Sequence, residues 1–80
     1  MPVQNLLDRI TFNPEVLCGK ATIRGMRISV EQILKYLAGG GATQELLDDY
    51  PELEPSDIQA VLLYASQLLA EEHVYLLKAA

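Results

Sequence analysis

The sequence has a single cysteine and no long uncharged apolar run. Cys18 is the only cysteine in 80 residues, so the chain has no second thiol with which to close an internal disulfide. A transmembrane helix needs about 18 consecutive apolar residues, and the longest run here is only a few residues long. Asp8 and Arg9 interrupt the start of the chain, where a secretory leader would be apolar. We therefore expect a protein of the cytoplasm without disulfides or membrane spans.

The composition is typical of one small globular domain. Half of the residues are apolar, and 11 acidic residues against 6 basic ones give a formal net charge of -5. We predict a single domain over residues 1–80, with an N-terminal arm or short helix (1–9), a small β segment (10–28) and a helical part (29–80). A chain of this length has a marginal core, so we also expect a homo-oligomer, which would bury further apolar surface.

Charge is distributed unevenly along the chain. Residues 1–36 carry five basic and three acidic residues, whereas residues 37–80 carry one basic and eight acidic residues. An acidic half attracts basic protein surfaces, while the modestly basic half could touch nucleic acid. The alternative, that both halves are ordinary solvated faces, stays open.

The pattern after residue 28 predicts a mainly α fold, a three-helix bundle of the helix-turn-helix type with a long C-terminal helix. Ser29 and Gln32 have capping-box spacing and predict a first helix over 30–38, which the glycines at 39–41 end. Thr43 is expected to cap a short second helix that ends before Pro51. Ser56 is expected to cap a last helix over about 56–77.

The last helix is apolar on two sides. One stripe is predicted to face the core: Ile58, Val61, Leu62, Ala65, Leu68, Leu69 and Leu76. The opposite stripe is predicted to be a protein interface: Leu63, Ala70, Val74 and Leu77. In the alternative reading, the N-terminal piece that contains Leu6 and Leu7 folds back over this second stripe.

No catalytic constellation is visible in the sequence. His73 is the only histidine and lies far from Cys18 in sequence, so neither a metal set nor a Cys/His pair is predicted. The adjacent pair Asp48-Asp49 lies in a predicted helix, where neighbouring side chains do not face each other. We expect no cofactor and no enzymatic activity.

A helix-turn-helix arrangement raises the question of DNA binding. The second and third helices begin among acidic residues, which would face DNA phosphates and weaken binding. The better candidates for nucleic-acid contact are Lys20, Arg24 and Arg27 in the β segment. The alternative is that these cations are solvent-exposed or pair with Glu15 and Glu31.

Several motifs follow one another in an order that resembles a known family. They are Arg9-Ile10-Thr11-Phe12-Asn13-Pro14-Glu15-Val16, then Gly19-Lys20, Ile23-Arg24-Gly25-Met26-Arg27, Val30-Glu31-Gln32-Ile33-Leu34, and Glu45-Leu46-Leu47-Asp48-Asp49-Tyr50-Pro51-Glu52-Leu53. Over roughly residues 9–69 the chain resembles the bacterial domain-of-unknown-function family 433. It departs from that family at Ala21, where proline is usual, and in its three glycines at 39–41.

The resemblance implies a homeodomain-like helix-turn-helix fold and a role as an antitoxin beside toxins with a PIN-like ribonuclease fold. We therefore expect an interaction protein that binds and neutralises a basic nuclease and could also repress its own operon. An acidic surface of Asp48, Asp49, Glu52 and Glu54 is expected to steer that partner. The alternative is a DNA-binding transcriptional regulator that uses Lys20, Arg24 and Arg27.

Overall fold

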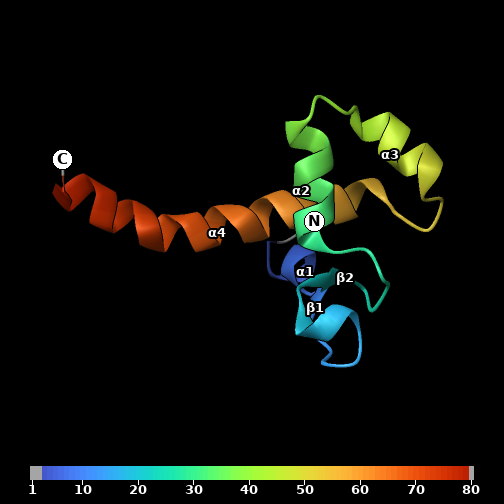
Figure 1. Ribbon diagram of the computed structural model, residues 1–80, viewed down its shortest axis with the longest axis horizontal. Helices are drawn as coiled ribbons and strands as arrows, with labels where there is room; N and C mark the ends of the chain where they lie inside the picture. Colours follow the sequence, from blue (N-terminus) through green and yellow to red (C-terminus); the bar gives the residue numbers. More distant parts are fainter. Residues whose placement is uncertain (1–2, 80) are drawn as a thin grey trace.

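The structure is a computed structural model that describes the backbone of residues 3–79 and the side chains of residues 5–70. The chain is mainly helical, with a small antiparallel sheet near the N-terminus and a long C-terminal helix (Figure 1). The elements in chain order are α1 (Val3–Leu7), β1 (Ile10–Thr11), the 3-10 turn η1 (Leu17–Gly19), β2 (Thr22–Ile23), α2 (Val30–Ala38), α3 (Thr43–Asp49) and α4 (Pro55–Ala79). This architecture confirms the predicted fold class.

Two short strands form the β segment expected within residues 10–28. Strand β1 runs antiparallel to β2 and places Ile10 opposite Ile23 and Thr11 opposite Thr22. Paired residues lie on the same side of a sheet, and both isoleucines are buried in the core. The two threonine hydroxyl oxygens lie 3.0 Å apart and share a hydrogen bond. The ribbon is thus held by apolar burial at one residue pair and by side-chain hydrogen bonding at the next.

The turn after β2 holds two successive residues in the left-handed region. Arg24 has φ 45° and Gly25 has φ 75°, and the Met26 N–H donates to the Ile23 carbonyl at 2.7 Å. Positive φ at both central residues is typical of a type I′ turn. Glycine adopts this conformation without strain, but an arginine there costs about 1–2 kcal/mol. Arg24 is therefore held in place by contacts of its side chain.

Helix α2 begins and ends where the sequence predicted. The Ser29 hydroxyl accepts a hydrogen bond from the Gln32 N–H at 2.9 Å, which satisfies one of the unpaired amides of the first turn. Gly39 follows the helix, and Gly40 takes φ 91°, which a side chain would strain. A Cβ on Gly41 would overlap the ring of Tyr36, so this glycine allows the ring to lie against the backbone.

The predicted cap of α3 is wrong. Thr43 is the first residue of the helix, Ala42 occupies the cap position, and no side chain accepts a hydrogen bond from the first turn. Two side-chain contacts instead attach α3 and its end to α2. The Tyr36 hydroxyl donates to Glu45 Oε2 at 3.2 Å, and Gln32 Nε2 donates to the Tyr50 hydroxyl at 3.2 Å. Tertiary contacts thus compensate for the missing cap.

Helix α4 begins with Pro55, one residue before the predicted start, and continues to Ala79. Proline suits the first helical position because the amide it lacks would have no partner there. The backbone N–H of Glu54 donates to Asp57 Oδ2 at 2.8 Å, which is the contact that the third helical residue makes in a capping box. Asp57, and not Ser56, therefore provides the side-chain cap of this helix.

The core covers only the first turns of α4. Its buried apolar residues are Ile10, Ile23, Ile28, Val30, Ile33, Leu46, Leu53, Ile58, Ala60 and Val61. Three leucines that the helical period assigned to the core are exposed, namely Leu62 (50%), Leu68 (54%) and Leu69 (60%). The period is correct, but α4 leaves the domain after about two turns and its apolar stripe continues beyond it (Figure 1). Leu76 lies outside the described side chains.

The N-terminal helix α1 packs against α4, and Leu6 lies against the core. The N-terminal piece thus folds against α4, while Ala70 of the second stripe remains exposed. Among the helices that the structure describes, none combines the length and apolar character that a bilayer crossing requires.

Candidate functional site

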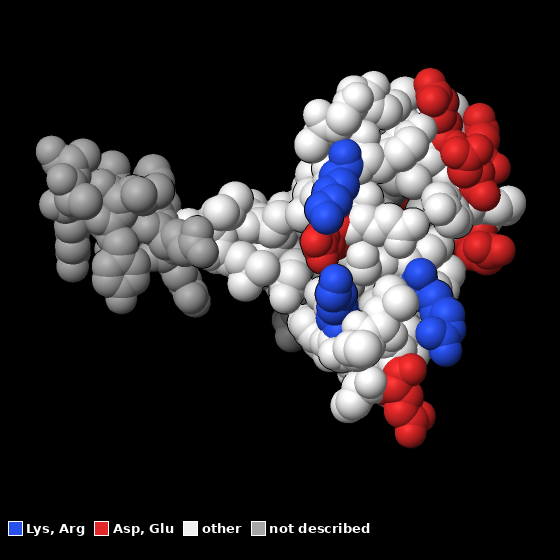
Figure 2. All heavy atoms as spheres, in the orientation of Figure 1, with Lys and Arg blue, Asp and Glu red and all other residues white. Residues whose placement is uncertain are grey.

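Carboxylates gather over α3 and the loop that follows it, at the upper right of Figure 2. Asp48, Asp49 and Glu52, three members of the predicted acidic surface, are exposed there. Glu45 on the first turn of α3 is also exposed and extends this surface, although the sequence-based prediction omitted it. We call Glu45, Asp48, Asp49 and Glu52 the α3 acidic surface.

Glu54 differs from the rest of the predicted acidic surface. Its Oε1 lies 2.6 Å from Arg9 Nη1 in an ion pair. Within residues 5–70, by contrast, no Lys or Arg forms an ion pair with a member of the α3 acidic surface. Four of the six carboxylates without an ion pair in residues 5–70 therefore lie on α3 and the loop after it.

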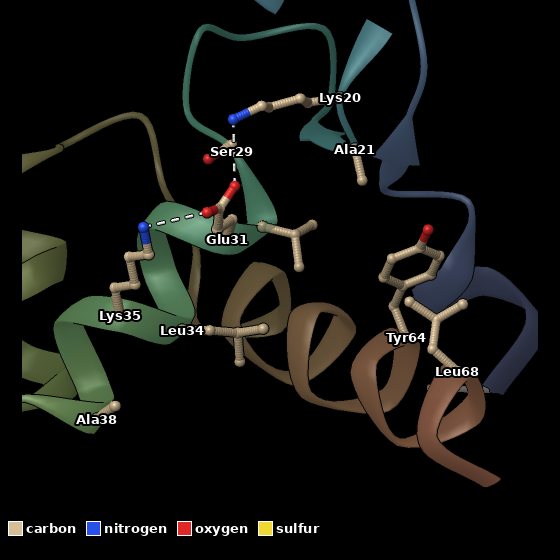
Figure 3. A pocket seen from close by; sticks show the side chains of 10 residues that line it. Lys20, Ala21, Ser29, Glu31, Leu34, Lys35, Ala38, Tyr64 and Leu68 are labelled. Atoms are coloured by element: carbon tan, nitrogen blue, oxygen red, sulfur yellow. Dashed lines mark hydrogen bonds and ion pairs between the residues drawn. The ribbon is translucent and has the colours of Figure 1, made fainter. Parts of the chain in front are cut away.

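A mainly apolar groove of about 480 Å³ lies between α2 and α4. In Figure 3, Leu34 of α2 faces Tyr64 and Leu68 of α4 across this groove. Its full lining is Lys20, Ala21, Ser29, Val30, Glu31, Leu34, Lys35, Ala38, Tyr64 and Leu68. We call it the α2–α4 groove. The groove forms where α2 and α4 pack together, so no sequence motif predicts it.

The rim of the groove carries three linked charges. Glu31 accepts from Lys20 Nζ at 3.2 Å and from Lys35 Nζ at 3.1 Å. The Lys35 ammonium, followed by that of Lys20, holds the pKa of the Glu31 carboxyl below its usual range. Pairing between exposed charges contributes little to stability. Because Glu31 cancels the charge of only one of the two lysines, the rim has a net charge of +1 on a chain that is acidic overall.

The stripe predicted to be a protein interface is only partly described. Leu63 is half-buried and Ala70 is exposed, while Val74 and Leu77 lie outside the described side chains. At 100° per residue, Leu63 and Ala70 lie nearly opposite Leu68 on α4. The α2–α4 groove and the predicted stripe are thus different faces of the same helix.

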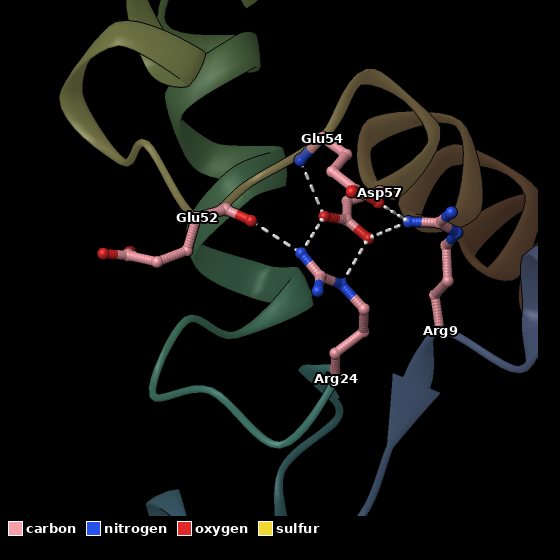
Figure 4. A network of polar contacts seen from close by, with 5 residues as sticks. All are labelled: Arg9, Arg24, Glu52, Glu54 and Asp57. Atoms are coloured by element: carbon pink, nitrogen blue, oxygen red, sulfur yellow. Dashed lines mark hydrogen bonds and ion pairs between the residues drawn. The ribbon is translucent and has the colours of Figure 1, made fainter.

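Asp57 is buried at the centre of an ionic network that the sequence analysis missed (Figure 4). Arg24 reaches both of its carboxylate oxygens, with Nε 3.1 Å from Oδ1 and Nη2 2.9 Å from Oδ2. Arg9 Nη1 lies 2.9 Å from Oδ1 on the other side, and Arg24 Nη2 also donates to the Glu52 carbonyl at 2.6 Å. The available signal was Asp57 itself, an acidic residue in the first turn of the last helix.

The network affects both ionisation and the proposed DNA contact. Burial disfavours the charged form of Asp57, but hydrogen bonds from Arg24, the Glu54 amide and Arg9 outweigh burial and keep its pKa below the usual range. The Arg24 guanidinium is bound to the Asp57 carboxylate. Its side chain therefore holds the ribbon against α4 and is a poor candidate for contacting phosphate.

The two other candidate nucleic-acid residues are exposed but lie in different settings. Lys20 is engaged with Glu31 at the groove rim, as the pairing alternative anticipated. Arg27 is exposed and forms no ion pair within the described side chains. The three cations predicted together are thus divided among the groove rim, the buried network and open solvent.

Among residues 5–70, no group of three or more His, Cys, Asp or Glu side chains is placed to hold a metal ion. Cys18 is exposed in the η1 turn, and His73 lies outside the described side chains. The described surface therefore offers two features for function, the α3 acidic surface and the α2–α4 groove.

The sequence and the fold of this chain are similar to those of known proteins. A family model described as "Protein of unknown function (DUF433)" matches residues 10–65. The crystal structure of a DUF433 member protein from Anabaena variabilis superposes with a TM-score of 0.74 at 36% sequence identity, covering 86% of this chain and 68% of that one.

A curated sequence relative is the uncharacterized protein y4eO of Sinorhizobium fredii, which is 29% identical over 56 residues. The match covers 70% of this chain but 25% of that protein, so the chain spans about a quarter of the relative's length.

Proposed function

The chain belongs to the DUF433 family, and we propose that it is an antitoxin-like protein that binds and neutralises a basic PIN-like nuclease. The family description assigns no activity, so the proposal is argued from the surface of this chain. The observation that carries it is the uneven distribution of unpaired charge: Glu45, Asp48, Asp49 and Glu52 lack ion pairs, whereas four of the five Lys and Arg side chains within residues 5–70 form them.

The α3 acidic surface suits a cationic partner for a physical reason. Glu45, Asp48, Asp49 and Glu52 are exposed and lack ion-pair partners within the described residues. Their charge would raise the rate of encounter with a basic protein, and this effect weakens as salt screens it. A nuclease that binds the RNA backbone needs cations in its cleft. Carboxylates that pair with those cations would block access of the RNA.

The rigid attachment of α3 supports the same role. Glu45 accepts from Tyr36, Tyr50 accepts from Gln32, and Gln44 Nε2 donates to Asp48 Oδ1 at 3.0 Å. A surface whose side chains are held in place loses less conformational freedom on binding. The surface is therefore partly organised before a partner arrives.

The experiment pairs this chain with the protein encoded by the neighbouring reading frame. We expect co-expression to relieve growth arrest caused by that protein and the two purified proteins to bind. The double variant Asp48→Asn/Asp49→Asn keeps the side-chain shape, and it is expected to slow association at low salt by about tenfold. Stopped-flow or surface-plasmon measurements over a salt series give this rate.

A matched control removes the same charge from the N-terminal part of the chain. Asp8→Asn/Glu15→Gln neutralises two exposed carboxylates outside the α3 acidic surface and is expected to leave the association rate nearly unchanged. Equal slowing by the two double variants would mean that only net charge matters. Absence of any complex would refute the proposal for that partner.

The DNA-binding alternative has less support from the geometry. Arg24 is held by Asp57 and Lys20 by Glu31, which leaves Arg27 as the candidate whose side chain has no such partner in the described part of the chain. Binding of the purified protein to its own upstream DNA, falling steeply with salt and lost in Arg27→Ala, would favour this alternative. DNA binding that appears only with the partner protein would fit a repressing antitoxin complex.

A further inference from the structure

The central part of α4 is free of charge. From Ile58 to Ala70, thirteen consecutive residues contain no Asp, Glu, Lys or Arg, yet Leu62, Leu68 and Leu69 are half or more exposed. A solvent-facing helix normally carries charged residues on its outer side. The polar residues of this segment, Gln59, Ser66 and Gln67, lie within an arc of about 100°, so the exposed leucines form an apolar surface outside that arc.

Part of the exposed apolar surface is shaped as a hollow. Tyr64 and Leu68 form the α4 wall of the α2–α4 groove, and Leu34 and Ala38 form the α2 wall. Phe12 is 60% exposed and lies against Tyr64, with the ring centroids 6.1 Å apart. Large aromatic and aliphatic side chains around a hollow are typical of the centre of a protein interface.

The same helix also carries the projections that could fill such a hollow. Tyr64, Ala65, Leu68 and Leu69 lie within an arc of about 140° on α4 at 100° per residue. The groove and the leucine side chains that project beside it thus lie next to each other on one surface. A two-fold interface requires this property, because the same patch must serve both partners.

Charge favours a second copy as the occupant. The chain carries a net charge of -5, so two copies repel each other wherever their acidic surfaces meet. The α3 acidic surface lies away from the groove, and the rim of the groove (Lys20, Glu31 and Lys35) has a net charge of +1, opposite in sign to that of the whole chain. Two copies that meet through α4 and the groove keep their α3 acidic surfaces out of the contact.

We propose that a second copy of this chain docks its α4 into the α2–α4 groove, forming a two-fold symmetric dimer through Tyr64, Leu68, Leu69 and Ala38. The two α4 helices run antiparallel, and each helix of 25 residues is about 37 Å long, enough to cross the partner's groove. The population of such a dimer rises with protein concentration by mass action. This dimer does not depend on the proposed nuclease binding.

Sedimentation velocity of the full chain over a hundredfold range of concentration tests the dimer. The wild type is expected to move from the 8.9 kDa of one chain towards twice that mass as concentration rises. Leu68→Glu and Ala38→Lys place a charge on the two walls of the groove, and each is expected to weaken association at least about tenfold. Both side chains are exposed, and far-ultraviolet circular dichroism verifies that the variants remain folded.

Ala70→Glu is the matched control, since it adds the same charge to α4 on the face opposite Leu68. It is expected to leave the dimer intact. A wild type that stays at the mass of one chain throughout overturns the proposal. So does a dimer that survives both groove variants, or one that Ala70→Glu breaks in their place, which would assign the contact to the Leu63 side. A groove that binds the neighbouring nuclease while the chain stays monomeric would give it a different occupant and also overturn the dimer.

Discussion

Arg24 and Asp57, thirty-three residues apart in sequence, form a two-pronged ion pair in which both carboxylate oxygens accept from one guanidinium. The planar guanidinium matches a carboxylate in this geometry, which makes such pairs directional. Arg24 lies in the turn after β2, and Asp57 lies in the first turn of α4. The pair therefore fixes the ribbon against the start of the long helix.

Asp57→Asn is expected to destabilise the protein by roughly 2 to 3 kcal/mol. The substitution leaves Arg9 and Arg24 without their shared carboxylate, and the cost stays at or below that of a fully buried pair because Arg24 is partly in water. Urea unfolding followed by circular dichroism measures the change. The control Asp48→Asn removes an exposed carboxylate and should change stability by less than about 0.5 kcal/mol. Equal effects of the two substitutions would contradict the role of the network.

The contribution of Asp57 should depend on pH in one direction. Its pKa is lower in the folded protein than the value near 3.9 of an unfolded chain, so its stabilising effect is complete above about pH 4 to 5 and is lost as the pH falls through the folded pKa. The stability difference between wild type and Asp57→Asn should therefore be constant near neutral pH and shrink in acid. Urea titrations at a series of pH values measure it, and a difference that widens in acid would contradict the shift.

Replacing Arg24 separates its ion pair from its backbone strain. Arg24→Ala and Arg24→Gly both remove the guanidinium, but only glycine accepts φ 45° without strain. Arg24→Gly should therefore be the more stable variant, by about 1 kcal/mol. Thermal and urea unfolding of the two variants measure the difference. If Arg24→Ala were the more stable of the two, the left-handed conformation at this position would be wrong.

Ser29→Ala should cost about 1 kcal/mol, because the Gln32 amide loses the hydroxyl that accepts its hydrogen bond. Thr43→Ala is the matched comparison, since Thr43 lies at the start of α3 and provides no cap. Its effect should stay within about 0.5 kcal/mol. Urea unfolding of both variants tests whether the cap, and not the loss of any hydroxyl, accounts for the change.

Local signals in the sequence were enough to place α2. Ser29, Gln32 and the glycines from 39 to 41 act within a few residues of the helix, and the structure has the helix at the predicted residues. The predicted start of α4 was less accurate, because Ser56 and Asp57 both suit a helix start. The choice between them depends on the residues that surround them in the fold. Asp57 is the cap because its ion pairs with Arg9 and Arg24 make its burial favourable.

The order of residues by itself determined the helical period, the ends of α2, the β-prone segment and the uneven division of charge. These depend on neighbours three or four positions apart or on composition, so they can be derived without a fold. Only the tertiary structure decided that Asp57 is buried with two arginines, that Leu62, Leu68 and Leu69 extend past the core, and that α2 and α4 enclose a groove. Burial depends on which distant segments meet, and periodicity marks an apolar face without saying how far along a helix other elements cover it.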